Sequence, residues 1–345
     1  MSTLEQLLAI LRNTFLESIR QPVVLVVCVA ATIFVVLSNP FSAWTMQEDQ
    51  RMFLDIGLST VFLATAVLAS FLATNVLARE IENRTVLTVV SKPVPRPVFI
   101  LGKFLGVSAS MLVALLYLGL VFSLVEVHGT LQTARDPFHL PVILFGLGAM
   151  VAAVAVGAWM NFFYGRSFAA WTLTLSVPFL GLAYLLSLFF DAEFKSVPIG
   201  LQFEPEVWKA LFLIALATLV LNAIAIAAST RLGQVLTLTI VVGMFVLGLL
   251  SDWMFGSPLA STKAAMTEIT AAGGSVSIAL YAKWAFLSLC RAAVPNFQLY
   301  WLADALTQKK AIPADYFAFA IAYTVALVTG LLAIATALFQ RREVG

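Results

Sequence analysis

The sequence carries very little charge. Only 11% of its 345 residues are Asp, Glu, Lys or Arg, and 61% are hydrophobic. Soluble globular chains are typically about a quarter charged and near half apolar. The net charge of +2 is too small to indicate nucleic-acid binding. The apolar residues form continuous runs rather than the short alternating segments of a strand barrel. The composition therefore predicts several helices of about 20 residues, each able to cross about 30 Å of hydrocarbon.

Residues that catalyse reactions or bind metals are also scarce. Two cysteines allow one disulfide at most, and we expect both thiols to be unpaired. The only histidines, His128 and His139, lie eleven residues apart around a loop that also holds Asp136. A metal site there would need a third ligand such as Glu126, and the spacing fits no standard zinc pattern. We therefore expect ordinary loop residues here, with no metal site and no catalytic residue.

The sequence also lacks a nucleotide-binding motif. Its single Gly-Lys pair, Gly102-Lys103, is followed by Phe104 and has Pro97 in the place of the first glycine of a P-loop. Ion-coupled carriers place ionisable groups inside the membrane, but the span interiors here hold no carboxylate. We expect Lys103, which lies near a span end, to reach the interface by snorkelling. Energy for any transport must therefore come from another chain.

Hydropathy predicts an all-α integral membrane protein with about eight transmembrane helices. The first candidate span is short, but no charge follows it until Glu48. The eight spans are Val23–Leu37, Ile56–Leu77, Val98–Val125, Val142–Phe163, Phe168–Phe190, Ala210–Ala228, Leu232–Leu250 and Tyr316–Phe339.

The distribution of basic residues predicts how these spans are oriented. With the N-terminus in the cytoplasm, the inner segments hold Arg12, Arg20, Arg79, Arg84, Lys92, Arg96, Lys103, Arg166, Arg231, Arg341 and Arg342. The short outer loops then hold only Arg51, Arg135, Lys195 and Lys209, and one long outer loop holds the remaining five. Lys and Arg concentrate in cytoplasmic loops, and long loops follow this rule weakly. We therefore expect both termini to be cytoplasmic, with the chain in the cell's inner membrane.

A short amphipathic segment precedes the spans. Leu4, Leu7, Leu8, Leu11 and Phe15 recur at spacings of one, three and four residues, which indicates a helix with one apolar face. We interpret residues 1–21 as an interfacial helix on the cytoplasmic surface. Residues 22–345 then form one transmembrane domain.

The outer segment 251–313 is the largest piece expected outside the bilayer. Within it, Ser275–Leu289 is apolar, but it is only 15 residues long and contains Lys283. These properties argue against a ninth span. We interpret Ser275–Leu289 as an interfacial or re-entrant helix on the outer face.

Small residues recur at spacings of four in two spans. Ala149, Ala153 and Gly157 form one set, and Gly102 and Gly106 form the other. Small residues let membrane helices approach closely. We favour packing within the chain, and the alternative is a dimer face.

A charged continuation of the second span ends in a proline-broken turn. Residues 78–106 read AREIENRTVLTVVSKPVPRPVFILGKFLG. This run resembles the cytoplasmic loop of permeases of type-2 ATP-binding-cassette (ABC) exporters, where an acidic, Thr-containing helix precedes a turn with Pro and Arg.

Two later parts of the chain have the same resemblance. One is AAVPNFQLYWLADAL before the last span, together with the final LFQRREVG, and the other is AASTRLGQVLTLTIVVGMFVLGLL. Family members often carry a Pro-Asn-Phe motif outside, a Phe-x-Arg-Arg tail inside and a Ser-bearing turn between late spans. The order and sidedness of the three parts make the combination fairly specific. Residues 142–190 depart from the family because they form a span pair beyond the usual six.

The resemblance implies the membrane permease subunit of an ATP-driven exporter. Such a subunit is not an enzyme and binds no cofactor, since a separate ABC ATPase subunit binds ATP and Mg. It works with a second permease copy, in a homodimer or heterodimer. Segment 79–97 would be cytoplasmic and dock on the ATPase, and Pro295, Asn296 and Phe297 would shape the outer gate. The implied docking residues are Glu80, Ile81, Glu82, Asn83, Arg84, Thr85, Val86 and Leu87.

Two other functions stay open beside export of a hydrophobic or amphipathic substrate. The chain would be a non-transporting scaffold or force transmitter if the same ATPase drove work on a periplasmic partner through segment 251–313. An ion-coupled carrier is disfavoured by span interiors without carboxylates.

Overall fold

A computed structural model describes residues 2–43, 45, 48–78, 94–130, 137–308 and 310–340 of the chain. Over these residues the backbone is mainly helical and forms no sheet. Eight helical stretches are long and apolar enough to cross a membrane, which confirms the predicted all-α fold and its eight spans. Hydrocarbon offers no hydrogen-bond partners, so each apolar run pairs its own N–H and C=O groups in a helix.

The helices divide between the N-terminal and C-terminal halves of the chain. The first half contains α1 (Thr3–Ile19), α2 (Pro22–Ser42), α3 (Asp49–Ala73), the π-helical turn η1 (Thr74–Ala78), α6 (Arg96–His128), α7 (Leu140–Tyr164) and α8 (Phe168–Ser187). The second half contains η2 (Ile199–Leu201), α9 (Pro205–Ser229), α10 (Gln234–Ser251), η3 (Asp252–Gly256), α11 (Ser257–Ala271), α12 (Ile278–Ala293), η4 (Phe297–Tyr300), α13 (Ala303–Thr307) and α14 (Ala314–Gln340).

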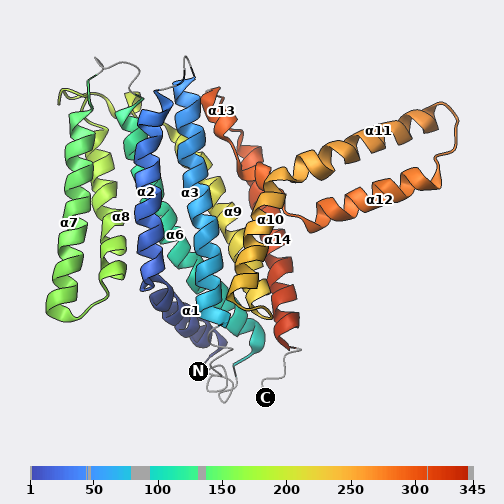
Figure 1. The fold of residues 1–345 in the computed structure, drawn as a ribbon, viewed down its shortest axis with the longest axis horizontal. Coiled ribbons are helices and arrows are strands. Elements are labelled where there is room, and N and C mark those ends of the chain that lie inside the picture. Colours follow the sequence, from blue (N-terminus) through green and yellow to red (C-terminus); the bar gives the residue numbers. More distant parts are fainter. Residues whose placement is uncertain are drawn as a thin grey trace.

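The long helices stand side by side in a bundle, and α1 lies across one end of it (Figure 1). Helix α1 and the end of α14 lie at the same end of the bundle, which we call the termini side. The opposite end, which carries α13, is the far side. Helices α6 and α9 form much of the interior, because 72% and 83% of their apolar windows are buried. Only 11% of the α14 window and 22% of the α7 window are buried.

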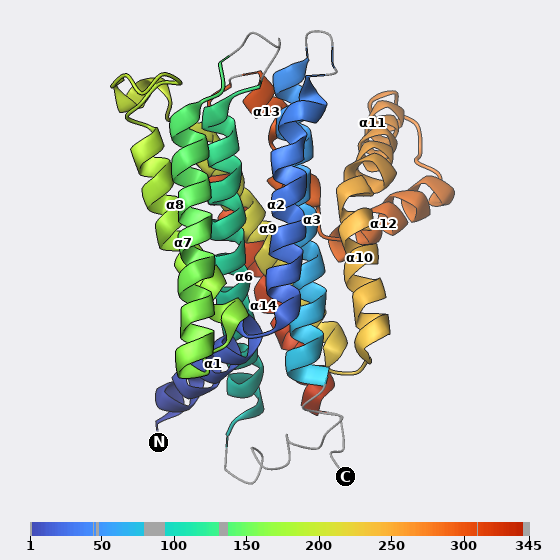
Figure 2. The same cartoon turned by 60° about the vertical axis from the view of Figure 1, so that its left-hand side comes forward.

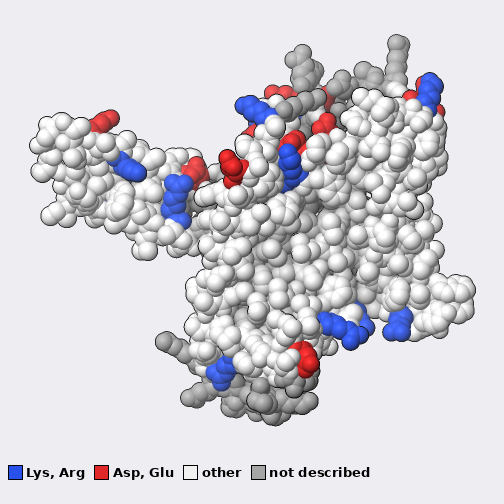
Figure 3. Space-filling view, turned by 180° about the vertical axis from the view of Figure 1, so that it is seen from behind, with Lys and Arg blue, Asp and Glu red and all other residues white. Residues whose placement is uncertain are grey.

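Charged side chains gather at the two ends of the bundle. Figure 3 shows a broad band of uncharged surface between them, with mainly Lys and Arg visible on the termini side. Exposed apolar residues of this band include Val26 on α2, Val151 on α7 and Val325 on α14. This pattern fits a bundle whose middle faces hydrocarbon and whose ends face water.

Helix α1 packs closely against α6 through the two glycines of α6. A Cβ at Gly102 would lie 2.7 Å from Ile10 Cγ2, and one at Gly106 would lie 2.8 Å from the carbonyl oxygen of Leu11. The contact face of α1 includes buried Thr14, whereas Leu8 on the predicted apolar face is 53% exposed. The helix thus presents Ile10, Thr14 and Ser18 to the protein and leaves Leu4 and Leu8 exposed for the membrane interface.

Helices α7 and α8 form a second closely packed pair. Ala153 of α7 is fully buried, and a Cβ at Gly157 would lie 2.1 Å from Thr172 Oγ1 of α8. The small residues of α6 and α7 therefore pack within the chain, as we favoured, because each glycine meets a neighbouring helix of the same molecule.

Helices α11 and α12 project sideways from the bundle as an antiparallel arm, which leaves it in the half away from the termini (Figure 1). The arm comprises residues 257–293. Helix α12 covers most of the predicted interfacial helix Ser275–Leu289 and adds no ninth span. Its apolar residues Ile278 and Leu289 are 88% and 70% exposed.

A first prediction tests the contact between α1 and α6. We expect Gly106→Val to destabilise the folded chain by about 1–3 kcal/mol, because the added atoms overlap Thr14 and the backbone of α1. The measurement is the thermal unfolding midpoint of the purified chain in detergent. Gly148→Val is the matched control, since nothing lies within 4 Å of a Cβ at Gly148. Equal midpoints for the two variants would show that α1 does not depend on this contact.

Candidate functional site

The predicted docking residues on the termini side, Glu80 to Leu87, lie outside the described residues. The structure does describe both flanks of segment 79–97. Helix α3 and its π-helical end η1 lead into the segment, and α6 begins at Arg96 near its other end. Short π-helical stretches occur often at functional sites. Within η1 the hydroxyl of Thr74 donates a hydrogen bond to the carbonyl of Ser70.

Three polar contacts join the helices around these flanks. Asn75 Nδ2 of η1 donates to Gln21 Oε1 before α2, at 2.9 Å. Arg96 Nη1 of α6 donates to the carbonyl of Gln340 at 2.6 Å. Arg231 Nε, after α9, donates to the carbonyl of Leu338 at 3.0 Å. Both arginines bind carbonyls at the end of α14, where the helix dipole favours cations. We call these three contacts the termini-side frame.

Lys103 lies about two turns further into α6 than Arg96, and its position corrects the expectation of snorkelling. The residue is only 2% exposed. Its Nζ lies 4.0 Å from Glu17 Oε2 and 5.6 Å from the centre of the Phe99 ring. Helix α1 packs against α6 next to this lysine, so Lys103 is paired inside the protein.

The Pro-Asn-Phe motif is part of a buried aromatic cluster halfway along α3. Phe297 is 0% exposed, and its ring centroid lies 6.0 Å from Phe62 of α3 and 6.1 Å from Phe245 of α10. Phe62 and Phe245 themselves meet edge to face at 4.8 Å. Trp301 stacks on Phe62 at 6.3 Å. The motif therefore joins α3 and α10 at one point.

Gly248 of α10 makes the close approach of this motif possible. A Cβ at Gly248 would lie 2.2 Å from Phe297 Cδ2 and 2.7 Å from the carbonyl oxygen of Pro295. A side chain at this position would push the motif away from α10.

Hydrogen bonds fix the same motif to α14. The backbone N–H of Asn296 donates to Tyr323 Oη at 3.0 Å, and the Asn296 side chain caps η4. The Tyr300 and Thr324 hydroxyls share a hydrogen bond of 2.7 Å. Burial raises the pKa of Tyr300 to about 12, so its phenol stays neutral. Residues 295–297 are thus anchored on three helices.

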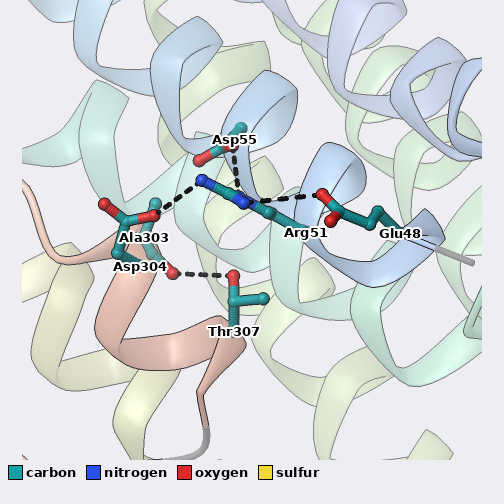
Figure 4. A network of polar contacts seen from close by, with 6 residues as sticks. All are labelled: Glu48, Arg51, Asp55, Ala303, Asp304 and Thr307. Carbon is teal, nitrogen blue, oxygen red and sulfur yellow. Dashed lines mark hydrogen bonds and ion pairs between the residues drawn. The ribbon is translucent and has the colours of Figure 1, made fainter.

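An exposed charge network lies beside α13 at the far-side tip of α3. Figure 4 shows Arg51 between Glu48, Asp55 and Asp304. Its nitrogens lie 3.5, 3.9 and 3.4 Å from oxygens of these three carboxylates. All four side chains are more than 40% exposed, and such pairs each contribute only about 0–1 kcal/mol. The network positions α13 against α3 more than it stabilises the fold.

The two histidines stand on the far side, around the start of α7. His139 is buried and accepts a hydrogen bond on Nδ1 from the backbone of Val142. Burial, followed by the nearby charge of His128, lowers the pKa of His139. Over the described residues, no group of three or more His, Cys, Asp or Glu side chains is arranged to hold a metal ion.

Comparison with known proteins identifies the family. Residues 8–203 match the family model described as ABC-2 family transporter protein, which is more than half of the 345 residues. No curated protein matches the sequence. The chain belongs to the ABC-2 transporter family.

Membership makes the chain a multi-pass permease subunit and not itself an ATPase, and it implies association with a separate ABC ATPase subunit. The matched part runs from α1 to the end of η2 and so includes the pair α7 and α8. The Pro-Asn-Phe motif and the arm lie beyond the match.

The structure brings together residues that sequence reasoning did not select. Phe62, Phe245 and Gly248 complete the aromatic cluster of this permease. Nothing in the sequence marks them, because phenylalanine and glycine are common in apolar spans. These three residues can be recognised only once the helix contacts are known, because a glycine opposite a buried ring then indicates close packing.

A second prediction tests the aromatic cluster. We expect Phe297→Ala to destabilise the permease by roughly 3 kcal/mol or more, since the truncation leaves a cavity and removes several ring contacts. Chemical or thermal unfolding in detergent measures the change. Phe286→Ala on α12 is the control, because that ring is 64% exposed and its removal costs about 0.5 kcal/mol or less. A loss of stability no larger than that of the control would contradict the role of Phe297.

Proposed function

We propose that this permease couples ATP hydrolysis by its ABC ATPase to export, and that segment 79–97 docks on the ATPase. The observation that carries the proposal is the termini-side frame. Asn75 on one flank of the segment bonds to Gln21 between α1 and α2. Arg96 on the other flank bonds to the end of α14. A force on the segment therefore acts on α1, α2 and α14 as well as on α3 and α6.

Helix α3 connects the docking segment with the aromatic cluster halfway along the bundle. Phe62 lies about 18 Å along the helix from Thr74, the first residue of η1. A helix transmits displacement along its length, and Phe62 packs on Phe245 and Phe297. Movement of α3 would shift α10 and the Pro-Asn-Phe motif together. We propose that Pro295, Asn296 and Phe297 control the outer opening of the pathway in this way.

The proposal includes a definite orientation and set of partners. The termini side faces the cytoplasm of a cell with an inner membrane, and the partner ATPase binds ATP and Mg there. The excess of Lys and Arg near the termini supports this orientation. The permease works with a second permease copy, identical or different. Its substrate is hydrophobic or amphipathic, because apolar spans would line the pathway.

The third prediction tests docking by reversing charge. We expect Glu80→Lys with Glu82→Lys to dissociate the ATPase or uncouple its activity, because both carboxylates would contact the ATPase. The permease is purified from its native membrane, and the co-purifying ATPase and its ATP hydrolysis are measured. Glu268→Lys, an exposed site on α11 of the arm, is the control. Unchanged co-purification and hydrolysis in the double variant would refute docking through these residues.

The arm favours a second candidate function. Helices α11 and α12 make extensive contacts only with each other and with the neighbouring η3. Helix α12 exposes Ile278, Phe286 and Leu289. Exposed apolar side chains of a membrane protein contact lipid or another protein, and the second candidate function assigns those of the arm to a protein. The permease would then transmit force from the ATPase through the arm to a partner protein on the far side.

The fourth prediction separates the two functions. Under force transmission, a photo-cross-linking amino acid at position 286 gives an adduct with another protein, and Leu289→Ser removes it. The matched control is Leu201→Ser in η2, where the leucine is 75% exposed on the same side. Adducts with lipid or with a second permease copy only would reject force transmission, and export would stand.

A further inference from the structure

The depth of the arm in the membrane follows from its contacts with the bundle. No charged residue follows Asp55 along α3, so its carboxylate marks the far-side edge of the apolar band. Phe62 lies about 10 Å further along the same helix. Phe297 packs on Phe62, and Pro295 lies against Gly248 of α10. The Pro-Asn-Phe motif therefore lies well inside this edge, at the depth of Phe62.

The two helices of the arm lie at different depths. Helix α12 ends at Ala293, and Val294 alone separates it from Pro295, so its end is as deep as the motif. Helix α11 follows η3, which begins at Asp252, about 6 Å beyond Gly248 toward the far side. Both views of the ribbon show α12 on the termini side of α11 (Figure 1 and Figure 2). Helix α12 is thus the deeper of the two, and α11 lies nearer the membrane surface.

The exposed side chains of the two helices follow the same order. Helix α12 exposes Ile278, Phe286 and Leu289, which helical spacing places on one face as an apolar stripe. Helix α11 exposes Lys263 and Glu268, and its large apolar side chains are half-buried. The surface of the arm thus becomes more apolar with depth, as the membrane itself does. A partner protein would not require this order.

The charged residues of the arm fit the headgroup region of a phospholipid leaflet. Arg291, at the deep end of α12, pairs with Asp252 at 3.5 Å. Lys263 and Lys283 form no ion pair with any residue that the structure describes. Lys263 and Tyr281 line a cleft of about 400 Å³ between the two helices. Their ammonium and hydroxyl groups can donate hydrogen bonds to phosphate oxygens, and the long side chain of Lys283 can reach the same level by snorkelling.

We infer that the arm lies in the far-side leaflet and binds its phospholipids. The stripe of α12 lies among the acyl chains, and Lys263 and Lys283 contact the phosphates. This position does not depend on ATPase docking or on the substrate. It agrees with export, and it leaves force transmission through the arm without the apolar face that a partner protein would bind.

This position would tie the Pro-Asn-Phe motif to the membrane, because α12 leads directly into the motif. Under the proposed function the motif controls the outer opening of the pathway. The arm would then hold one side of that opening at a constant depth while α3 and α10 move. This consequence rests on the proposed function, whereas the position of the arm does not.

The fifth prediction measures the depth of the arm with nitroxide spin labels. The full-length permease is placed in vesicles of phosphatidylethanolamine and phosphatidylglycerol. Cys28 is 0% exposed and does not react, so Cys290→Ser leaves one introduced cysteine to carry the label. Oxygen concentrates in hydrocarbon, whereas a soluble nickel chelate stays in water. We expect the ratio of oxygen to nickel collisions to be about tenfold or more higher for Phe286→Cys than for Glu268→Cys, because only the stripe of α12 is immersed in hydrocarbon.

Two controls and a second lipid probe complete the experiment. Val325→Cys on α14 sets the hydrocarbon value, because Val325 is 58% exposed in the apolar band. Leu289→Cys repeats the measurement at a second position of the stripe. A lipid whose headgroup carries chelated nickel then tests headgroup contact. We expect it to relax a label at Thr267→Cys, in the cleft, strongly, and a label at Val325→Cys only weakly.

Four results would overturn the inference. A water-like ratio at position 286 would place the arm in water, and a hydrocarbon-like ratio at 268 would immerse the whole arm. Few collisions of either kind at 286 would mean that a protein covers the stripe. Absence of relaxation at 267 would mean that headgroups do not reach the cleft. The labelled positions are exposed and tolerate substitution, and equal unfolding midpoints verify the fold. No ATPase is present, so failure here is distinct from failure of docking.

Discussion

Close packing along α6 is the constraint on which the rest of the bundle depends. In hydrocarbon there is no hydrophobic force between helices, so association relies on small residues and hydrogen bonds. Gly102 and Gly106 admit α1, and Asn222 of α9 donates from Nδ2 to Ser108 Oγ at 2.7 Å and to the carbonyl of Phe104 at 3.1 Å. Helix α6 also contacts α2, α3, α7, α8 and α14. Under the proposed function, segment 79–97 docks on the ATPase and ends in the first turn of α6, so a force on the segment would reach every helix that α6 contacts.

The eight spans were predictable because the property that creates them is local. An apolar run of sufficient length becomes a helix in a membrane whatever its neighbours are. The ends were less predictable. The first span, Val23–Leu37, was short and was accepted because the uncharged run continues toward Phe41, and α2 does extend past Pro40 to Ser42, since a proline near a helix end costs few backbone bonds. The arm was predicted only as the single helix Ser275–Leu289. Its partner α11 is polar on much of its surface, and hydropathy therefore gave no sign of it.

The residues of the candidate site stay predictions, and their surroundings could not be predicted from the sequence. The family resemblance pointed to Glu80–Leu87, which lie outside the described residues, and to Pro295, Asn296 and Phe297. It gave no reason to pair Phe297 with Phe62, because the two are 235 residues apart and lie among many similar apolar residues. Lys103 is a second residue whose surroundings could not be predicted from its place in the sequence. Its position near a span end suggested snorkelling, but α1 packs beside it and Glu17 lies within 4.0 Å. Contacts between distant parts of the chain decide the environment of each residue. The periodicity of apolar residues along the sequence does not reveal those contacts.

The helices differ in how firmly they are held, and this difference connects structure with function. Helices α3, α6, α9 and α10 share buried rings and a buried amide, so under the proposed coupling they would move together. The α7–α8 pair is held mainly by its own internal contacts, and the arm touches the bundle near η3. A moving core needs such weakly attached neighbours, because helices packed tightly on every side would resist displacement. Tight contacts thus transmit force from α6 to the aromatic cluster, and loose ones limit how much of the molecule must move with it.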